Sequence, residues 1–256
     1  MAKRLIVTCM DRRLVEKLKG YDNGDTIIVC NAGANVLGLR GTITRLVGEN
    51  KLTEIFVFTH DQCGAMKIVS DHLFNNQRAT SDVYAHLVKQ FDYARVESTA
   101  DLDGVNLKIQ DERIKTIAPG IKVHSEMIKL STLGIPAGMM EYQKGTQLIV
   151  SQPIADGYSR MFEGSEKYMT YAVVGQGDEI LDDIEIAVSK LDVVEITFLI
   201  QGEDERKRME KYRDRVKMTI HRWESSLARE IRMKIKNNTK QNAAVEAKKS
   251  TGIPSY

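Results

Sequence analysis

Three short apolar runs rich in β-branched residues constrain the fold of this chain more than any other feature. They lie at 4–8 (RLIVT), 26–30 (TIIVC) and 54–59 (EIFVFT), and the helical patterns at 12–19 and 41–48 separate them. Apolar residues run continuously along each segment, which is typical of strands buried on both faces. Strands of this kind that alternate with helices predict an α/β fold whose core is a parallel sheet with flanking helices.

The same pattern returns about 140 residues later. QLIVS at 147–151, TYAVVGQG at 170–177 and EITFLIQ at 195–201 repeat the three early segments in order and spacing. We therefore expect two similar halves, at 1–144 and 145–236, followed by a polar, mobile tail at 237–256.

The segments between these strands are assigned from local patterns. Helices are expected at 65–74 and 81–96, and short strands at 105–109 (VNLKI) and 120–124 (GIKVH). Residues 203–236 read as one long helix with a basic surface and an apolar stripe. The stripe consists of Val216, Ile220, Trp223, Leu227, Ile231 and Ile235. We expect this basic surface to face solvent, and the alternative is that it binds an acidic partner.

Composition excludes several classes of protein. The chain has 256 residues, a formal net charge of only +2 and three cysteines. An odd, low cysteine count argues against a disulfide framework and favours a reducing compartment. No run approaches the roughly 20 apolar residues of a membrane span. We therefore expect a cytoplasmic location.

Two polar clusters follow predicted strands. Cys9 lies at the end of the first strand, whereas His60 and Cys63 lie at the end of the third. Ligands of open parallel sheets sit outside the carboxyl ends of the strands, so these side chains meet if the two strands are neighbours. Two thiolates and one imidazole suit zinc, and three protein ligands leave a fourth position open, as in catalytic sites.

An acidic and a basic residue accompany the first cluster. Asp11 lies two residues after Cys9, where its carboxylate can reach the open position. Arg13 can pair with Asp11 and keep it ionised and oriented. Zinc generates hydroxide at neutral pH, and Asp11 would orient that hydroxide.

The C-x-D-x-R segment at 9–13 and the H-x-x-C-G segment at 60–64, together with Asn31-Ala32-Gly33, resemble the motifs of β-class carbonic anhydrases. The resemblance covers roughly residues 3–68. It implies zinc on Cys9, His60 and Cys63, an Asp11–Arg13 dyad, and hydration of carbon dioxide to bicarbonate by zinc-bound hydroxide. In some members the aspartate itself ligates zinc. The family also dimerises, so we expect a homo-oligomer or a pseudo-dimer formed within one chain.

The chain departs from the family in two ways. Cys30 replaces the usual arginine before Asn-Ala-Gly and reads as a buried apolar residue. By the repeat, Gln152, Gln201 and about Asp204 take the places of the three ligands, which predicts one zinc site per chain and a structural second half. Two alternatives stay open: a carbonyl sulfide or carbon disulfide hydrolase that uses the same site, and a non-catalytic scaffold or binding protein.

Overall fold

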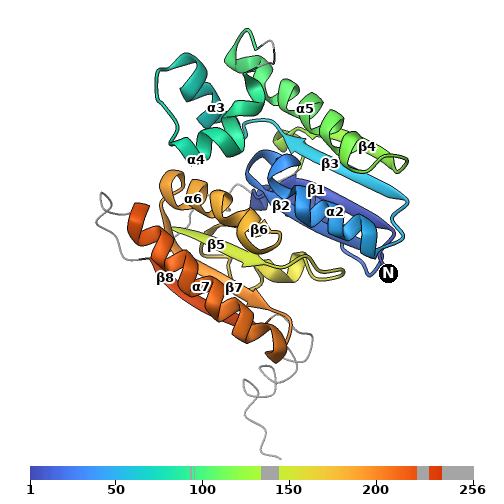
Figure 1. The fold of residues 1–256 in the computed structure, drawn as a ribbon, viewed down its shortest axis with the longest axis vertical. Helices are drawn as coiled ribbons and strands as arrows, with labels where there is room; N and C mark the ends of the chain where they lie inside the picture. The colour runs from blue at the N-terminus through green and yellow to red at the C-terminus, as the bar shows by residue number, and fades with distance from the viewer. Residues whose placement is uncertain (93, 95, 134–143, 224–230, 238–256) are drawn as a thin grey trace, which may run out of the picture.

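The computed structural model describes the chain except for residues 93, 95, 134–143, 224–230 and 238–256. One mostly parallel sheet of eight strands, in the order β4-β3-β1-β2-β6-β5-β7-β8, runs through the molecule (Figure 1). The strands are β1 Arg4–Cys9, β2 Thr26–Asn31, β3 Glu54–His60, β4 Lys122–Ile128, β5 Thr146–Ser151, β6 Met169–Val174, β7 Val193–Ile200 and β8 Arg232–Asn237. The helices are α1 Val15–Leu18, α2 Arg40–Glu49, α3 Gly64–Phe74, α4 Ser81–Val83, α5 Leu102–Ile117, α6 Leu181–Lys190 and α7 Glu203–Trp223. The predicted α/β class is confirmed.

Both halves of the sheet have the same strand order. β1 lies between β2 and β3, with β4 outside β3, and β5 lies between β6 and β7, with β8 outside β7. All these pairs are parallel. The halves meet where Cys30 of β2 pairs with Val174 of β6 in antiparallel orientation. These two residues are equivalent in the predicted repeat, so the junction lies on an approximate twofold axis.

Strand register supports the residue equivalences of the repeat. Leu5 of β1 faces Ile27 and Ile55, whereas Leu148 of β5 faces Tyr171 and Ile196. If Leu5 is taken as the equivalent of Leu148, the register makes Ile27 the equivalent of Tyr171 and Ile55 that of Ile196. The repeat in the sequence predicts the same equivalences. The exact domain limits stay a prediction, because residues 134–143 between the halves lie outside the described part.

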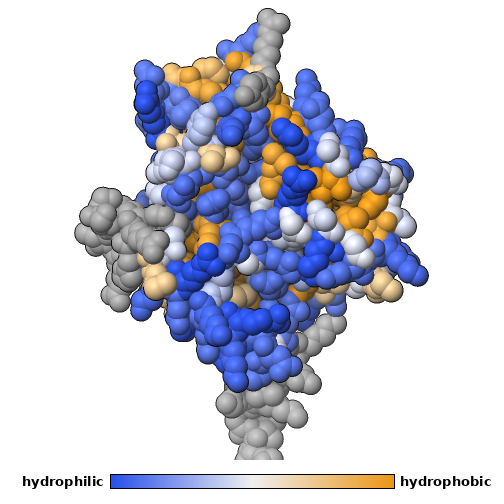
Figure 2. Space-filling model, viewed as in Figure 1, coloured by the Kyte–Doolittle hydropathy of each residue, from blue (hydrophilic) through white to orange (hydrophobic). Residues whose placement is uncertain are grey.

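The crossover rule explains where the helices lie. β2 to β3 and β3 to β4 step across the sheet in the same direction, so right-handed crossovers place α2 and α5 on one face. The same steps in the second half place α6 and α7 on that face, and Figure 1 shows all four helices there. Figure 2 shows a mostly hydrophilic surface on this side, with apolar side chains gathered mainly beside α2 and α5. In the described part of the chain no helix has the length and apolarity needed to cross a lipid bilayer.

Two segments differ from their predicted structure. Residues 105–109 lie inside α5 and not in a strand. The buried positions of α5 are Leu102, Asn106, Gln110 and Ile114, which follow one another at steps of four. Two of these residues are polar amides, so the apolar residues alone do not show the helical period.

The predicted helix at 203–236 is also wrong in its second part. α7 ends at Trp223, and 232–237 form strand β8, which pairs with β7. Met233 and Ile235 alternate with basic residues, which is a strand period, but Ile231 and Ile235 also fit a helical step of four. Pairing with β7 decides between the two readings. Three predictions concern residues outside the described part of the chain. They are the place of Leu227 in the apolar stripe, the tail after Asn237, and the helix predicted at 81–96 where it includes residues 93 and 95.

Carboxylates hold the halves together by accepting backbone N–H groups across the junction. Asp22 of the first half accepts three, from Gly157 at 2.9 Å, Tyr158 at 3.1 Å and Ser159 at 2.7 Å. Glu179 of the second half accepts from the backbone N–H of Thr42 at 2.8 Å, in the first turn of α2. Because the first N–H groups of a helix have no partner within the helix, Glu179 caps α2 from the other half.

Candidate metal centre

The carboxyl ends of β1 and β3 bring three side chains that can ligate a metal together. Cys9 ends β1, His60 ends β3, and Cys63 lies at the N-cap of α3. All three are buried. Their sulfur and ring nitrogen atoms lie within 4.8 Å of one another. The structure thus places together the three residues that the sequence nominated as ligands.

The geometry of this cluster fits a tetrahedral zinc ion. The two Sγ atoms are 3.8 Å apart, and two ligands about 2.3 Å from a tetrahedral zinc ion would be separated by about 3.8 Å. The Nδ1 atom of His60 is 2.7 Å from the carbonyl oxygen of Asp61, to which a proton on Nδ1 would donate. This leaves Nε2, which is buried and has no hydrogen-bond partner among the described residues. An orphaned ring nitrogen beside two thiols, with its other nitrogen held by a carbonyl group, is typical of a metal ligand.

Electrostatics within the cluster favour a thiolate at Cys9. The hydrogen bond from Cys63 lowers the pKa of Cys9 well below its usual value, against the effect of burial. That hydrogen bond, together with burial, raises the pKa of Cys63. Burial alone lowers the pKa of His60, but the negative charge of Cys9 raises it to about 9. Binding of a divalent cation would release the protons that remain on Cys63 and His60.

Asp11 and Arg13 form a close ion pair next to the cluster. The backbone N–H and the Nε–H of Arg13 donate to Oδ1 of Asp11 at 2.9 and 3.0 Å, and Nη2 donates to Oδ2 at 2.6 Å. Asp11 is only 5% exposed. Burial alone raises the pKa of Asp11, but the hydrogen bonds from Arg13 outweigh burial and lower it. The predicted pairing is present, and the catalytic role of the pair stays a prediction.

The sequence of this region decides the family. Residues 4–149 match the family model described as carbonic anhydrase. The chain belongs to the β-carbonic anhydrase family. The match runs from β1 into β5 and therefore includes the cluster of Cys9, His60 and Cys63 and the Asp11–Arg13 pair.

Two kinds of comparison show what this member of the family is similar to. It is 42% identical over 69 residues to "Putative carbonic anhydrase YvdA" of Bacillus subtilis, an alignment of 24% of this chain and 35% of the relative. The chain thus spans about a third of that relative's length. A tetrameric β-carbonic anhydrase of Sordaria macrospora is 16% identical, with 52% of this chain and 78% of that chain covered and a TM-score of 0.42. The carbonic anhydrase of Streptococcus mutans is 24% identical, with coverage of 52% and 78% and a TM-score of 0.35.

The loop after β2 packs against α3, beside the cluster. Gly33 has a φ of 72°, and a Cβ atom there would lie 3.2 Å from the side chains of Ala65 and Met66 on α3. Both the positive φ and the lack of space require glycine. The backbone carbonyl of Asn31, the first residue of the motif, accepts a hydrogen bond from Met10 at 2.9 Å. The Asn-Ala-Gly motif therefore positions the loop beside Cys9.

Two buried amides on α5 hold this loop and were missed by the sequence analysis. Asn106 donates to the carbonyl oxygen of Gly33 at 2.9 Å, and Gln110 accepts from the backbone N–H of Val36 at 2.9 Å. Gln110 also donates to Asn106 at 2.9 Å. The signal that could have found them is their spacing of four, in line with Leu102 and Ile114 on one helical face.

The second half of the chain supports the same loop from the other side. Asp183 on α6 accepts from the backbone N–H of Ala32 at 2.9 Å. Cys30 is fully buried at the junction and donates to the carbonyl oxygen of Ala172 at 3.0 Å. Cys30 therefore packs in the core, as its sequence context predicts. Within the described residues, Cys9, His60 and Cys63 are the one group of metal-ligating side chains with this spacing.

Proposed function

We propose that this chain catalyses the zinc-dependent hydration of carbon dioxide to bicarbonate. The observation that carries the proposal is the buried cluster of Cys9, His60 and Cys63 beside the Asp11–Arg13 ion pair. Cys9, His60 and Cys63 would hold the zinc ion. When bound, zinc supplies a Lewis acid that lowers the pKa of a coordinated water toward neutrality.

Hydrogen-bond counting assigns a role to Asp11. An ionised carboxylate offers about four acceptor sites. Three N–H groups of Arg13 occupy the carboxylate on one side, so about one acceptor site remains. Asp11 would use that site to accept a hydrogen bond from the attacking oxygen and so orient it toward carbon dioxide. Arg13 would hold Asp11 ionised in a place where burial alone favours the neutral acid.

The second half would serve as the structural partner in a pseudo-dimer within the chain. Its carboxylates contact the backbone of the metal-binding half at Ala32 and Thr42. In this proposal residues 1–144 carry the metal and residues 145–236 complete the scaffold. Further association of chains, a cytoplasmic location and an acidic partner for the basic helix stay predictions from the sequence.

Metal analysis and stopped-flow carbon dioxide hydration test the proposal. We expect about one zinc ion per wild-type chain, and loss of both zinc and activity in Cys9→Ser. Cys30→Ala is the matched control, because Cys30 is equally buried but lies outside the cluster, and it should keep its zinc. Asp11→Asn should keep zinc and lose about 10–100-fold in kcat. Full activity in metal-free wild-type protein, or a full zinc complement in Cys9→Ser, would contradict the proposal.

A further inference from the structure

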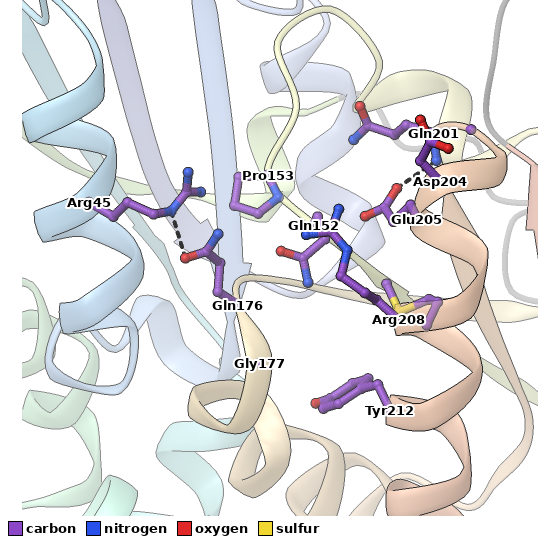
Figure 3. A pocket seen from close by; sticks show the side chains of 12 residues that line it. Arg45, Gln152, Pro153, Gln176, Gly177, Gln201, Asp204, Glu205, Arg208 and Tyr212 are labelled. Atoms are coloured by element: carbon purple, nitrogen blue, oxygen red, sulfur yellow. Dashed lines mark hydrogen bonds between the residues drawn. The ribbon is translucent and has the colours of Figure 1, made fainter.

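A cavity of about 690 Å³ opens at the carboxyl ends of β5, β6 and β7 (Figure 3). The strand register makes it the counterpart of the metal centre in the second half. Gln152 stands at the position of Cys9 and Gln201 at that of His60, and both line the cavity. Its size lies within the range of about 300–1,000 Å³ that is usual for small-molecule sites, and crevices at this end of a parallel sheet are where ligands bind.

The cavity lacks the features expected of a site that has merely lost its ligands. Apolar side chains would fill such a space, because cavities in a core are destabilising. Here the amide side chains of Gln152, Gln176 and Gln201 line the space. Gly177 also lines it with a φ of 50°, and no atom lies within 4 Å of where its Cβ would be. The wall of the cavity thus combines these polar groups with apolar side chains such as Pro153 and Met209, and it leaves room for a ligand.

Hydrogen-bond donors reach the cavity from two sides, and one of them has a fixed orientation (Figure 3). Arg45 reaches in from α2 of the first half, and its Nε donates to Oε1 of Gln176 at 2.6 Å. This contact fixes the Gln176 amide, whose NH₂ group is left to donate. Arg208 of α7 also lines the cavity and has no ion-pair partner within the described part of the chain. Figure 3 shows the side chains of Gln152, Gln176 and Arg208 converging on its centre.

Acceptors lie one helical turn before Arg208, on the same helix. Asp204 and Glu205 line the cavity at the start of α7, where Oε2 of Glu205 already accepts from the backbone N–H of Gln201 at 2.7 Å. Tyr212 lines the cavity with its ring, whereas its hydroxyl group is buried and has no hydrogen-bond partner among the described residues. The acceptors that a ligand can reach are therefore the two carboxylates.

We propose that this cavity binds a small zwitterion, a molecule of amino-acid to dipeptide size with one carboxylate and one ammonium group. Arg208 and the amides of Gln152 and Gln176 bind the carboxylate. Asp204 and Glu205 bind the ammonium group. Arg208 lies one helical turn after Asp204 and Glu205 on α7, so a cation and two anions stand side by side on one wall of the cavity. This arrangement matches a ligand that carries both charges, and it disfavours a ligand with a single charge.

Isothermal titration calorimetry of the full chain tests this site. The probes are the twenty L-amino acids and glycylglycine, with acetate and ethylammonium as single-charge comparisons. At least one zwitterion should bind with one site per chain and a Kd below about 1 mM. Arg208→Gln should weaken that binding about tenfold or more, because a charge-assisted hydrogen bond is lost. Arg213→Gln is the matched control on the same helix, where Arg213 pairs with Asp214, and it should bind like the wild type.

The metal centre must be separated from this site, because free amino acids also chelate zinc. Binding should persist in the metal-deficient variant Cys9→Ser, whether or not the chain hydrates carbon dioxide. Four results would overturn the proposal: no zwitterion binds below about 1 mM, acetate binds as tightly as the best zwitterion, Arg208→Gln binds like the wild type, or Cys9→Ser abolishes binding.

Discussion

His86 forms a buried ion-pair network between the two halves of the chain. It lies in a π-helical turn, Tyr84–Val88, and its ring atoms Nδ1 and Nε2 are 3.4 Å from Asp182 and 3.2 Å from Asp183 on α6. Its side chain is only 6% exposed. Burial alone lowers the pKa of His86, but the negative charge of Asp183 and the hydrogen bond to Asp182 raise it to about 10. The histidine is therefore a cation at neutral pH, and replacing it with glutamine should destabilise the fold in a pH-dependent way.

The sign and size of this effect follow from proton linkage. The folded pKa of about 10 lies above the ordinary value of about 6.5, so the stabilisation is fully present below about pH 6.5. It is lost as the pH rises through about 10. One pKa unit corresponds to about 1.4 kcal/mol, so the contribution is about 5 kcal/mol at pH 6, about 3 kcal/mol at pH 8 and below about 1 kcal/mol at pH 10. Between about pH 7 and 9.5 the slope is about 1.4 kcal/mol per pH unit.

Urea unfolding of the zinc-loaded wild type and of His86→Gln, followed by circular dichroism from pH 6.5 to 9.5, measures this slope. Other titrating groups are common to both proteins, so the difference in unfolding free energy isolates His86. The advantage of the wild type should shrink as the pH rises. His124→Gln on β4, where His124 lies beside Glu54 of β3, leaves the network intact and controls for the loss of a histidine. A difference that is constant across this range, or that grows with pH, would refute the reasoning.

Three further substitutions test the scaffold around the metal centre. Asp22→Ala leaves three backbone N–H groups at the junction unpaired and should lower the unfolding free energy by about 3 kcal/mol. Asp25 forms an exposed ion pair, so the control Asp25→Ala should change the unfolding free energy by less than about 0.5 kcal/mol. Asn106→Leu removes the side chain that donates to the carbonyl oxygen of Gly33 and should lower the unfolding free energy by about 2–3 kcal/mol in the same urea assay. An unchanged urea midpoint would show that Asn106 does not stabilise the loop after β2. Gly33→Ala meets both an unfavourable φ and close neighbours on α3 and should cost about 1–3 kcal/mol, whereas Gly24→Ala, with open space around it, should be tolerated in thermal melts.

The sequence by itself determined the sheet segments and the edge of the sheet at which the candidate ligands lie. β1, β2, β3 and their repeats are continuous apolar runs, and such runs have few alternatives to a buried strand. Cys9 and His60 follow from the sequence as residues of one sheet edge, because the carboxyl ends of parallel strands share that edge, whereas the pairing of β1 with β3 that brings them together came from the structure. The equivalence of Gln152 to Cys9 followed from the repeat in the same way. In each of these cases the local pattern has one physical reading.

Tertiary structure decided the segments whose local pattern has two readings. Residues 105–109 alternate like a strand but lie in a helix, because α5 buries Asn106 and Gln110 against the loop after β2. Residues 232–237 fit a helix or a strand, and the free edge of β7 selects the strand. The ion pairs of His86 and the cavity around Gln152 join residues far apart in the chain. Such contacts depend on how the two halves dock, and no local spacing of residues records that docking.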